Sequence, residues 1–307
     1  MQVFSKHNND LEPEEIARYA RHISLPEVGV EGQRRLKASS IICIGTGGLG
    51  SPLLMYLAAS GIGKIGIVDF DLVDESNLHR QIIHRQKSIG QSKAHSAYST
   101  IAAINPYCEV KIYEKILNKD NALEIIKPYD IVCDCTDNFP SRYLINDACL
   151  ILNKPNVYGS IERFKGQATV FNLDKTSPNL RDLIDEPPPP DLLPTCSEAG
   201  VIGVLPGIIG LIQATEVIKI ITKIGTTLSG RLLIFDALSM KFREIKIKQK
   251  KDQELINELI EYEGFCFQKN QVKNISAADF KSLIETEEDN IFLIDVRNSS
   301  ENEVNSI

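Results

Sequence analysis

The sequence of 307 residues contains no tryptophan, only three methionines and no Cys-x-x-C pair. Such pairs supply the thiolates of most structural zinc sites, so their absence removes the sequence signature of a tetrathiolate zinc site. The cysteines number seven, an odd count, and most of them lie within apolar runs. This placement indicates reduced thiols in a reducing compartment and argues against a disulfide framework.

The sequence also lacks long apolar runs and an excess of positive charge. No stretch reaches the roughly 18 consecutive apolar residues of a membrane span, and residues 1–10 lack the apolar core of a secretory signal. The net charge of −7 excludes a global basic field that would attract nucleic acid or an anionic membrane. We therefore expect neither nucleic acid nor a membrane among its partners.

What the sequence does contain is a strand, a glycine loop and a helix in succession. Apolar residues 41–44 lead into Gly45-Thr46-Gly47-Gly48-Leu49-Gly50, and a second apolar run, residues 65–68, ends at Asp69. A sharp turn from strand to helix points free backbone N–H groups at a phosphate, and an acid on the next strand binds ribose hydroxyls. The pattern predicts nucleotide binding, with a glycine-rich turn that binds no ligand as the alternative.

Strand and helix patterns alternate over the first half of the sequence. Strands are predicted at 41–45, 64–69, 110–116 and 131–135, and helices at 12–22, 49–60, 92–103 and 120–127. This alternation predicts an α/β fold with a Rossmann-like, mostly parallel sheet. Further strands near 156–159, 167–171 and 232–235, some of them antiparallel, continue the sheet. A helix at 208–221 is apolar on nearly all sides and should be buried.

The remaining segments are irregular or incomplete. Residues 172–200 carry Pro187 to Pro190 and read as a stiff surface crossover, because four prolines cannot join a ladder or a helix interior. Residues 245–270 are charged and low in apolar periodicity, as in a linker. A new pattern begins at residue 272, with Ser276 as a helix cap and a buried strand over 292–297. This last segment is too short for an independent domain.

Three charged side chains beyond the glycine loop narrow the chemistry. ATP carries about four negative charges, so its site needs several cations and usually Mg²⁺, whereas NAD presents only a diphosphate. Arg80 and Lys93 can supply cations, and Asp137 follows the strand at 131–135, whose carboxyl end opens on the nucleotide crevice. Taken singly, Arg80 and Lys93 could be surface cations and Asp137 a helix cap.

Together these motifs resemble the MoeB/ThiF/HesA family of ubiquitin-activating-like adenylyltransferases over roughly residues 11–245. The resemblance is carried by residues 18–22, 45–50, 69–71, 76–81, 90–93, 134–138, 194–200 and by Gln213-Ala214-Thr215-Glu216. Within the family the chain looks most like MoeB-type molybdopterin-synthase adenylyltransferases that carry a C-terminal rhodanese domain. The resemblance implies an adenylation domain over 1–247, a linker over 248–271 and the start of a truncated rhodanese-like domain over 272–307.

The resemblance implies acyl adenylation of the C-terminal glycine of a small ubiquitin-fold sulfur carrier, with ATP and Mg²⁺. It assigns nucleotide and phosphate contacts to Gly48, Asp69, Ser76, Asn77, Leu78, His79, Arg80, Lys93, Asp137 and Asn138. Asp69 would bind the ribose and Asp137 the Mg²⁺. Arg21 matches an arginine that reaches into the partner subunit's site, which implies a homodimer. Cys196 matches the position where some relatives form a covalent link to the carrier, and a structural thiol is its alternative role.

The sequence departs from the family pattern at two places. Relatives usually hold a structural zinc with two C-x-x-C pairs, which would fall at residues 179–182 and after Lys250, and both stretches lack cysteine. We therefore expect no zinc, and expect packing to hold the crossover. The rhodanese-like segment stops before any catalytic cysteine loop, so we expect it to be truncated or vestigial and unable to transfer sulfur.

Several alternatives stay open at this point. The carrier could serve molybdopterin, thiamine or tRNA thiolation pathways. An NAD(P)-dependent oxidoreductase would leave Arg80, Lys93 and Asp137 unexplained, and a non-catalytic nucleotide-binding scaffold would fit the missing zinc ligands. The usage of Asn, Lys and Ile suits an AT-rich bacterial or plastid genome, so we expect a cytoplasmic or plastid-stromal protein.

Overall fold

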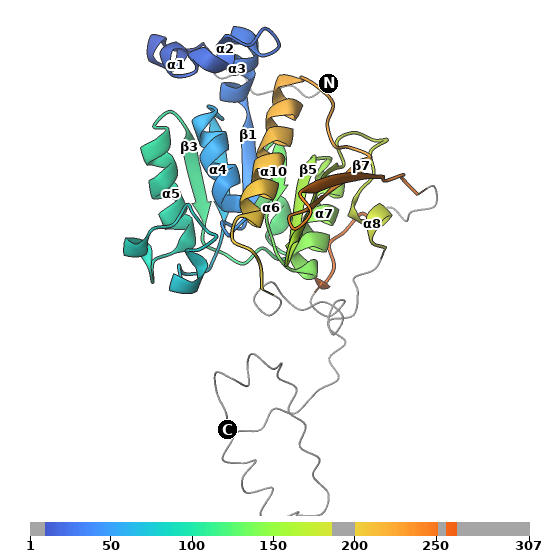
Figure 1. Ribbon diagram of the computed structural model, residues 1–307. Helices are drawn as coiled ribbons and strands as arrows, with labels where there is room; N and C mark the ends of the chain where they lie inside the picture. The colour runs from blue at the N-terminus through green and yellow to red at the C-terminus, as the bar shows by residue number, and fades with distance from the viewer. Residues whose placement is uncertain (1–9, 186–199, 251–255, 263–307) are drawn as a thin grey trace, which may run out of the picture. The chain divides into compact units, whose positions relative to one another are not determined.

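We analysed a computed structural model, which describes residues 10–185, 200–250 and 256–262 (Figure 1). The chain divides into two compact units, residues 1–267 and residues 268–307, and the second lies outside the described residues. Pro187 to Pro190, Cys196 and residues 272–307, which were expected to be rhodanese-like, also lie outside them. The domain limits expected from the sequence therefore stay predictions.

An eight-stranded sheet forms the centre of the first unit, in the order β3-β2-β1-β4-β5-β6-β7-β8. Strands β1 to β5 pair in parallel, and β5 to β8 pair antiparallel. This confirms the predicted fold class. The strands are β1 Ser40–Ile44, β2 Lys64–Val68, β3 Glu109–Tyr113, β4 Ile131–Asp134, β5 Asn156–Glu162, β6 Lys165–Phe171, β7 Arg231–Asp236 and β8 Lys241–Lys246.

Helices cover both faces of the sheet and form a small group at one end of it (Figure 1). One face carries α4 Gly50–Ala59, α5 Lys93–Ile104 and α10 Leu205–Thr222, and the other carries α6 Ala122–Ile126 and α7 Phe139–Leu152. The group at the end consists of α1 Pro13–Arg18, α2 Ala20–Ile23 and α3 Gly29–Ala38. Shorter elements are α8 Leu180–Leu183 and the 3₁₀ turns η1 Glu75–Asn77 and η2 Gln86–Ser88.

The apolar runs of the central strands are explained by burial on both faces. In β1, Ile41 and Cys43 pack with α4, α5 and α10, whereas Ile42 and Ile44 pack with α6 and α7. Parallel strands covered on both sides need apolar residues at every position, as here. The sheet therefore has an apolar core on each face, and β1 lies between β2 and β4 at the centre of its parallel part.

Helix α10 lies in the interior, as predicted for residues 208–221. By length and composition alone, it is the one helix in the described part of the chain that could cross a membrane. It packs against α4, β5 and β6, and its buried residues include the polar Gln213 and Glu216. These contacts are those of a core helix in a globular domain.

The structure differs from the sequence prediction at several elements. The predicted helix at 12–22 is broken at Tyr19, whose buried hydroxyl accepts a hydrogen bond from Asn105 Nδ2 at 2.8 Å. Helices α3 and α7 and strand β8 were not predicted. The linker predicted at 245–270 overlaps the end of β8. The strand was missed because all of its residues are exposed, so the sequence shows no burial alternation there.

Candidate nucleotide-binding site

The glycine loop joins β1 to α4 at the carboxyl end of the parallel strands. Gly45 has φ +91°, and its N–H donates to Val68 O of β2 at 2.8 Å. A Cβ atom on Gly50 would lie 2.1 Å from Gly45 O. Glycine is therefore required at both positions, the first for its left-handed backbone and the second for the close approach of the loop to the start of α4.

Asp69, at the end of β2, fastens this loop. Its carboxylate Oδ2 accepts hydrogen bonds from Thr46 N and Thr46 Oγ1, both at 2.7 Å, and Oδ1 accepts one from Asp71 N at 3.0 Å. Asp69 is buried, at 8% exposure, and also lines the cleft beside the loop. The ribose contact expected of Asp69 stays a prediction, and the structure adds a role in holding the loop that the sequence did not indicate.

The buried His84 lies between the glycine loop and α5 and contacts both. His84 Nε2 lies 3.2 Å from Thr46 O and Nδ1 lies 3.0 Å from Ser96 Oγ. A carbonyl oxygen can only accept, so a neutral His84 carries its proton on Nε2 and accepts from Ser96 at Nδ1. Burial lowers the pKa of His84, which favours this neutral form.

A cleft opens between the glycine loop and the ends of β2 and β4. Of the residues predicted from the sequence, it is lined by Gly48, Asp69, Arg80, Lys93, Asp137 and Asn138. The convergence follows from parallel pairing, because the carboxyl ends of β1, β2 and β4 meet at one edge of the sheet. The lining also includes Asp71, Lys115, Ser141 and Arg142, which the sequence did not indicate.

Two of the predicted cations are held by neighbouring groups. Lys93, at 7% exposure, begins α5, and its Nζ lies 2.7 Å from Asp71 Oδ2. Arg80 Nη1 donates to Ser76 O at 3.1 Å and lies 2.7 Å from His79 Nε2. The cleft therefore has preplaced positive charge, and the carboxylate of Asp71 balances the charge of Lys93.

Residues 76–79 have a different place from the one predicted. Ser76, Asn77, Leu78 and His79 do not appear in the lining of the cleft as far as the described residues form it. Ser76 N and Oγ donate to Asp74 Oδ1, so η1 folds on itself. In this structure the turn positions Arg80, and direct contacts of these residues to a nucleotide remain predictions.

Asp137 and Asn138 lie at the start of α7, both exposed and both in the lining of the cleft. The N-cap of α7 is Asn138, whose Oδ1 accepts from Ser141 N at 2.9 Å. The alternative reading of Asp137 as the helix cap is therefore wrong. Its carboxylate is the kind of oxygen ligand that Mg²⁺ prefers.

The donor set of the cleft fits Mg²⁺ bound together with a nucleotide. Among the described residues, no three His, Cys, Asp or Glu side chains come together as a metal-binding group. Mg²⁺ usually takes one or two carboxylates and completes its shell with phosphates and water, so Asp137 suits this mode. Of the other two predicted site residues, Arg21 is exposed on α2 and does not line the cleft. Cys196 lies outside the described residues, so its predicted role stays a prediction.

Polar contacts occupy the region where the family resemblance implies zinc. Asn179 and Asp182 form the capping box of α8, and Asp182 Oδ1 accepts from Lys250 N at 2.7 Å. Beside them, Asp147 of α7 accepts from Arg181 Nη2 at 2.8 Å, Arg181 Nε at 3.0 Å and Tyr262 Oη at 2.6 Å. We call Asp147, Arg181 and Tyr262 the Asp147 network.

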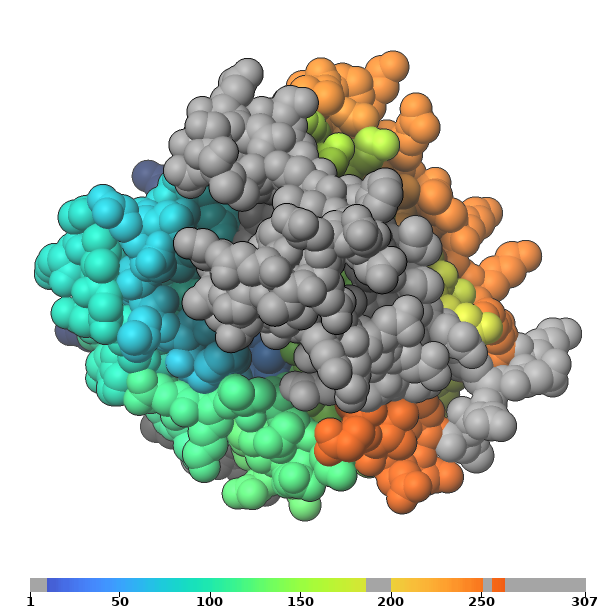
Figure 2. All heavy atoms as spheres, turned by 90° about the horizontal axis from the view of Figure 1, so that it is seen from below, coloured from blue at the N-terminus to red at the C-terminus, as the bar shows by residue number. Residues whose placement is uncertain are grey.

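The expectation that packing holds this region was incomplete. Asp147 is buried and Arg181 stacks 5.0 Å from the Tyr143 ring, so a charged network joins α7, α8 and residues 256–262. Figure 2 shows residues 256–262, coloured orange-red, on the surface beside a segment coloured green. Within residues 256–262, Glu261 Oε1 lies 2.9 Å from Lys119 Nζ. The carboxylate and amide groups at residues 179–182 do not form the four-thiolate set of a structural zinc.

A model of the ThiF family matches residues 19–256. The chain belongs to the ThiF family. Its relatives include a protein from Mycobacterium tuberculosis named probable adenylyltransferase/sulfurtransferase MoeZ, which is 52% identical over 83% of this chain and 66% of that protein. A Thermus thermophilus protein named sulfur carrier protein adenylyltransferase is 45% identical over 82% of this chain and 97% of that protein.

Solved structures agree with the fold of this ThiF family member. Crystal structures of E. coli MccB superpose with a TM-score of 0.70 at 19% identity, over 81% of this chain and 76% of that one. A second MccB structure, with ATP, gives a TM-score of 0.66 at 21% identity. At these identities the likeness establishes the fold alone, which confirms the α/β architecture expected from the sequence.

Proposed function

We propose that this ThiF family member is an ATP-dependent adenylyltransferase that activates the C-terminal glycine carboxylate of a small ubiquitin-fold sulfur-carrier protein. The observation that carries the proposal is the convergence of Arg80, Lys93 and Asp137 on the cleft beside the glycine loop. Several cations and a carboxylate match a triphosphate with Mg²⁺ better than the diphosphate of NAD. The names of its relatives, which include adenylyltransferases, support the same reaction.

In this reaction a carboxylate oxygen of the carrier attacks the α-phosphorus of ATP. The new P–O bond forms while the bond from the α-phosphorus to the oxygen bridging the β-phosphate breaks, which gives acyl-AMP and pyrophosphate. The attacking carboxylate is already ionised, so the protein needs to position two anions and offset their charge, and needs no base. Arg80 and Lys93 would hold the phosphates, and Mg²⁺ at Asp137 would neutralise triphosphate charge.

The proposal extends to partners and pathway. The protein would act as a homodimer in which the exposed Arg21 of α2 reaches the partner's site. The pathway we propose is molybdopterin biosynthesis, in the cytoplasm or the plastid stroma. Thiamine and tRNA thiolation use the same chemistry and differ only in the carrier. Cys196 could form a covalent link to the carrier after adenylation, or serve as a structural thiol.

The site assignment can be tested by measuring ATP–pyrophosphate exchange in variants that each lose one charged side chain. Arg80→Ala and Asp137→Ala should each lower carrier-dependent exchange by at least about a hundredfold. The first variant loses a cation that would stabilise the transferring phosphate, and the second loses the carboxylate that would hold Mg²⁺. Lys64→Ala is the control, since Lys64 begins β2 at the opposite end from Asp69 and pairs with Glu109 on the surface at 3.4 Å. Full exchange in both cleft variants would refute the assignment.

A further inference from the structure

Helix α10 carries a buried amide that bridges two strands of the sheet. Gln213 has no exposed surface, and its Nε2 donates to Asp134 O at 2.8 Å and to Val157 O at 3.0 Å. Its Oε1 accepts from Cys135 Sγ at 3.9 Å. The side chain therefore uses both its donors and its acceptor on β4, on β5 and on the residue that follows β4.

The amide lies where these two strands separate. Pairing of β4 with β5 ends at Asp134 and Tyr158, and the chain then turns into residues 135–138, which line the cleft. A Cβ atom on Gly159 would lie 2.5 Å from Gln213 Cδ and Oε1, so glycine there leaves the space that the amide fills. Gln213 thus supplies a hydrogen-bond donor to Asp134 O, at the point where the pairing of β4 with β5 ends and the lining of the cleft begins.

The contacts of Cys135 connect this amide to the glycine loop. Cys135 N donates to Ile44 O at 3.0 Å, directly before Gly45. A Cβ atom on Gly45 would lie 2.9 Å from Cys135 O, so the loop packs directly on this carbonyl group. The position of Cys135 therefore limits where both the glycine loop and Asp137 can lie.

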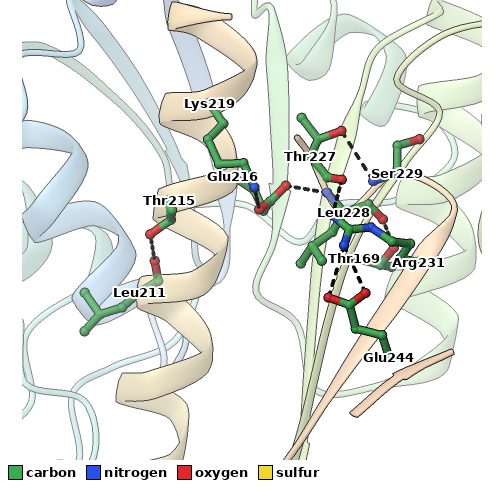
Figure 3. Close-up of polar contacts among 10 residues, drawn as sticks. All are labelled: Thr169, Leu211, Thr215, Glu216, Lys219, Thr227, Leu228, Ser229, Arg231 and Glu244. Atoms are coloured by element: carbon green, nitrogen blue, oxygen red, sulfur yellow. Dashed lines mark hydrogen bonds and ion pairs between the residues drawn. The ribbon is translucent and has the colours of Figure 1, made fainter. Parts of the chain in front are cut away.

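Glu216, one helical turn further along α10, fixes the helix itself. Its carboxylate accepts from Leu228 N at 2.7 Å and pairs with Lys219, as Figure 3 shows. Leu228 precedes β7, so α10 is fastened to the antiparallel part of the sheet by Glu216 and to β4 and β5 by Gln213. These contacts explain why Gln213 and Glu216 are buried in a mostly apolar helix.

We infer that Gln213 is a positioning residue of the nucleotide site, which holds residues 135–138 at the distance from the glycine loop that the reaction requires. The inference rests on the proposed adenylation. Gln213 lies too far inside the protein to touch a nucleotide in the cleft, and acts through Asp134 O and Cys135. A displacement of about 1 Å at a catalytic group costs on the order of a hundredfold in rate.

Two substitutions of similar size test this role. Gln213→Met fills the space without hydrogen bonds, and Gln213→Glu presents acceptors to two carbonyl oxygens. We expect Gln213→Met to lower the turnover of carrier-dependent exchange by about a hundredfold and to leave the carrier KM unchanged. In Gln213→Glu, protonation restores one donor, so its activity relative to wild type should rise as the pH falls.

The control is Thr215→Val on the same helix, because the exposed Thr215 hydroxyl donates only to Leu211 O at 2.8 Å within α10 (Figure 3). All variants are assayed well below their melting temperatures, with circular dichroism to verify folding. A purely structural role would lower the melting temperature and leave turnover and its pH profile as in wild type, which would overturn the inference.

Equilibrium dialysis with labelled ATP separates this inference from the proposed function. If wild type shows no exchange with any carrier, the proposed reaction fails, but a positioning role still predicts weaker ATP binding in Gln213→Met than in Thr215→Val. Equal ATP dissociation constants for these two variants, together with equal turnover where exchange is measurable, would refute the role assigned to Gln213.

Discussion

Replacing Asp147 by asparagine should strongly destabilise the domain. Asp147 is 1% exposed and accepts four hydrogen bonds, two from Arg181 and one each from Asn146 and Tyr262. Asparagine would leave the half-buried Arg181 guanidinium without its counter-charge and turn an N–H donor toward other donors. Removal of one partner from a buried ion pair costs about 3–5 kcal/mol.

The expected change in melting temperature follows from the size of the domain. For domains of this class a loss of 1 kcal/mol lowers the melting temperature by about 2–4 °C, so Asp147→Asn should lower it by roughly 6–20 °C. Tyr262→Phe removes one hydrogen bond to a charged group, worth about 1.5–3 kcal/mol, and should lie between Asp147→Asn and wild type.

The control is the exposed ion pair of Arg231 with Glu244, in which the side chains are 32% and 47% exposed. Exposed pairs contribute about 0.2–1 kcal/mol, so Glu244→Gln should change the melting temperature by no more than a few degrees. The assay is thermal denaturation followed by circular dichroism, with and without a zinc chelator, and zinc content measured by mass spectrometry.

The Asp147 network predicts that the chelator leaves the melting temperature of wild type unchanged and that the purified protein contains no stoichiometric zinc. Two results would refute this reasoning. One is an Asp147→Asn variant as stable as Glu244→Gln. The other is a chelator effect on wild type as large as that of Asp147→Asn, since it would mean that bound metal, rather than the polar network, holds this region.

Two further predictions concern the glycine loop and the proposed homodimer. Burial lowers the pKa of His84, so protonation of this residue favours the unfolded chain. The stability that neutral His84 contributes is complete above the unfolded pKa of about 6.5 and is lost as the pH falls below it. The melting temperature of wild type should therefore fall more steeply on acidification than that of His84→Gln, and parallel curves would contradict this. Mixing inactive Arg21→Ala and Asp137→Ala proteins should restore part of the exchange activity, because one site of a mixed dimer is intact, and no recovery after verified subunit exchange would exclude a role for Arg21 in the partner's site.

The sequence predicted which residues meet at the cleft best for those that follow the ends of parallel strands. Asp69 follows β2 and Asp137 follows β4, and strand pairing brings both positions to one edge of the sheet. Arg80 and Lys93 reach the same cleft from the segment between β2 and α5 and from the start of α5. Direct contacts of residues 76–79 to a nucleotide stay a prediction. That these residues fold into η1 could not be predicted, because Asp74 closes this turn by local hydrogen bonds that no periodic pattern shows.

Contacts between distant segments could not be predicted in this way. Gln213 stood out as part of a motif, but its bonds to Asp134 O and Val157 O depend on how α10 packs across the sheet. Arg142 lines the cleft because it lies in the first turn of α7, which begins at Phe139, and no helix was predicted there. The Asp147 network likewise joins residues from three separate segments, so only the fold reveals it.

The most direct test of the proposed function is to incubate wild type with ATP, Mg²⁺ and a ubiquitin-fold sulfur carrier that ends in Gly-Gly, and to measure both pyrophosphate exchange and the acyl-AMP mass adduct on the carrier. The account predicts exchange and the adduct with the intact carrier, and neither with the same carrier lacking its terminal glycine. Tight NAD binding, with no exchange for carriers of the molybdopterin, thiamine and tRNA thiolation pathways, would contradict it.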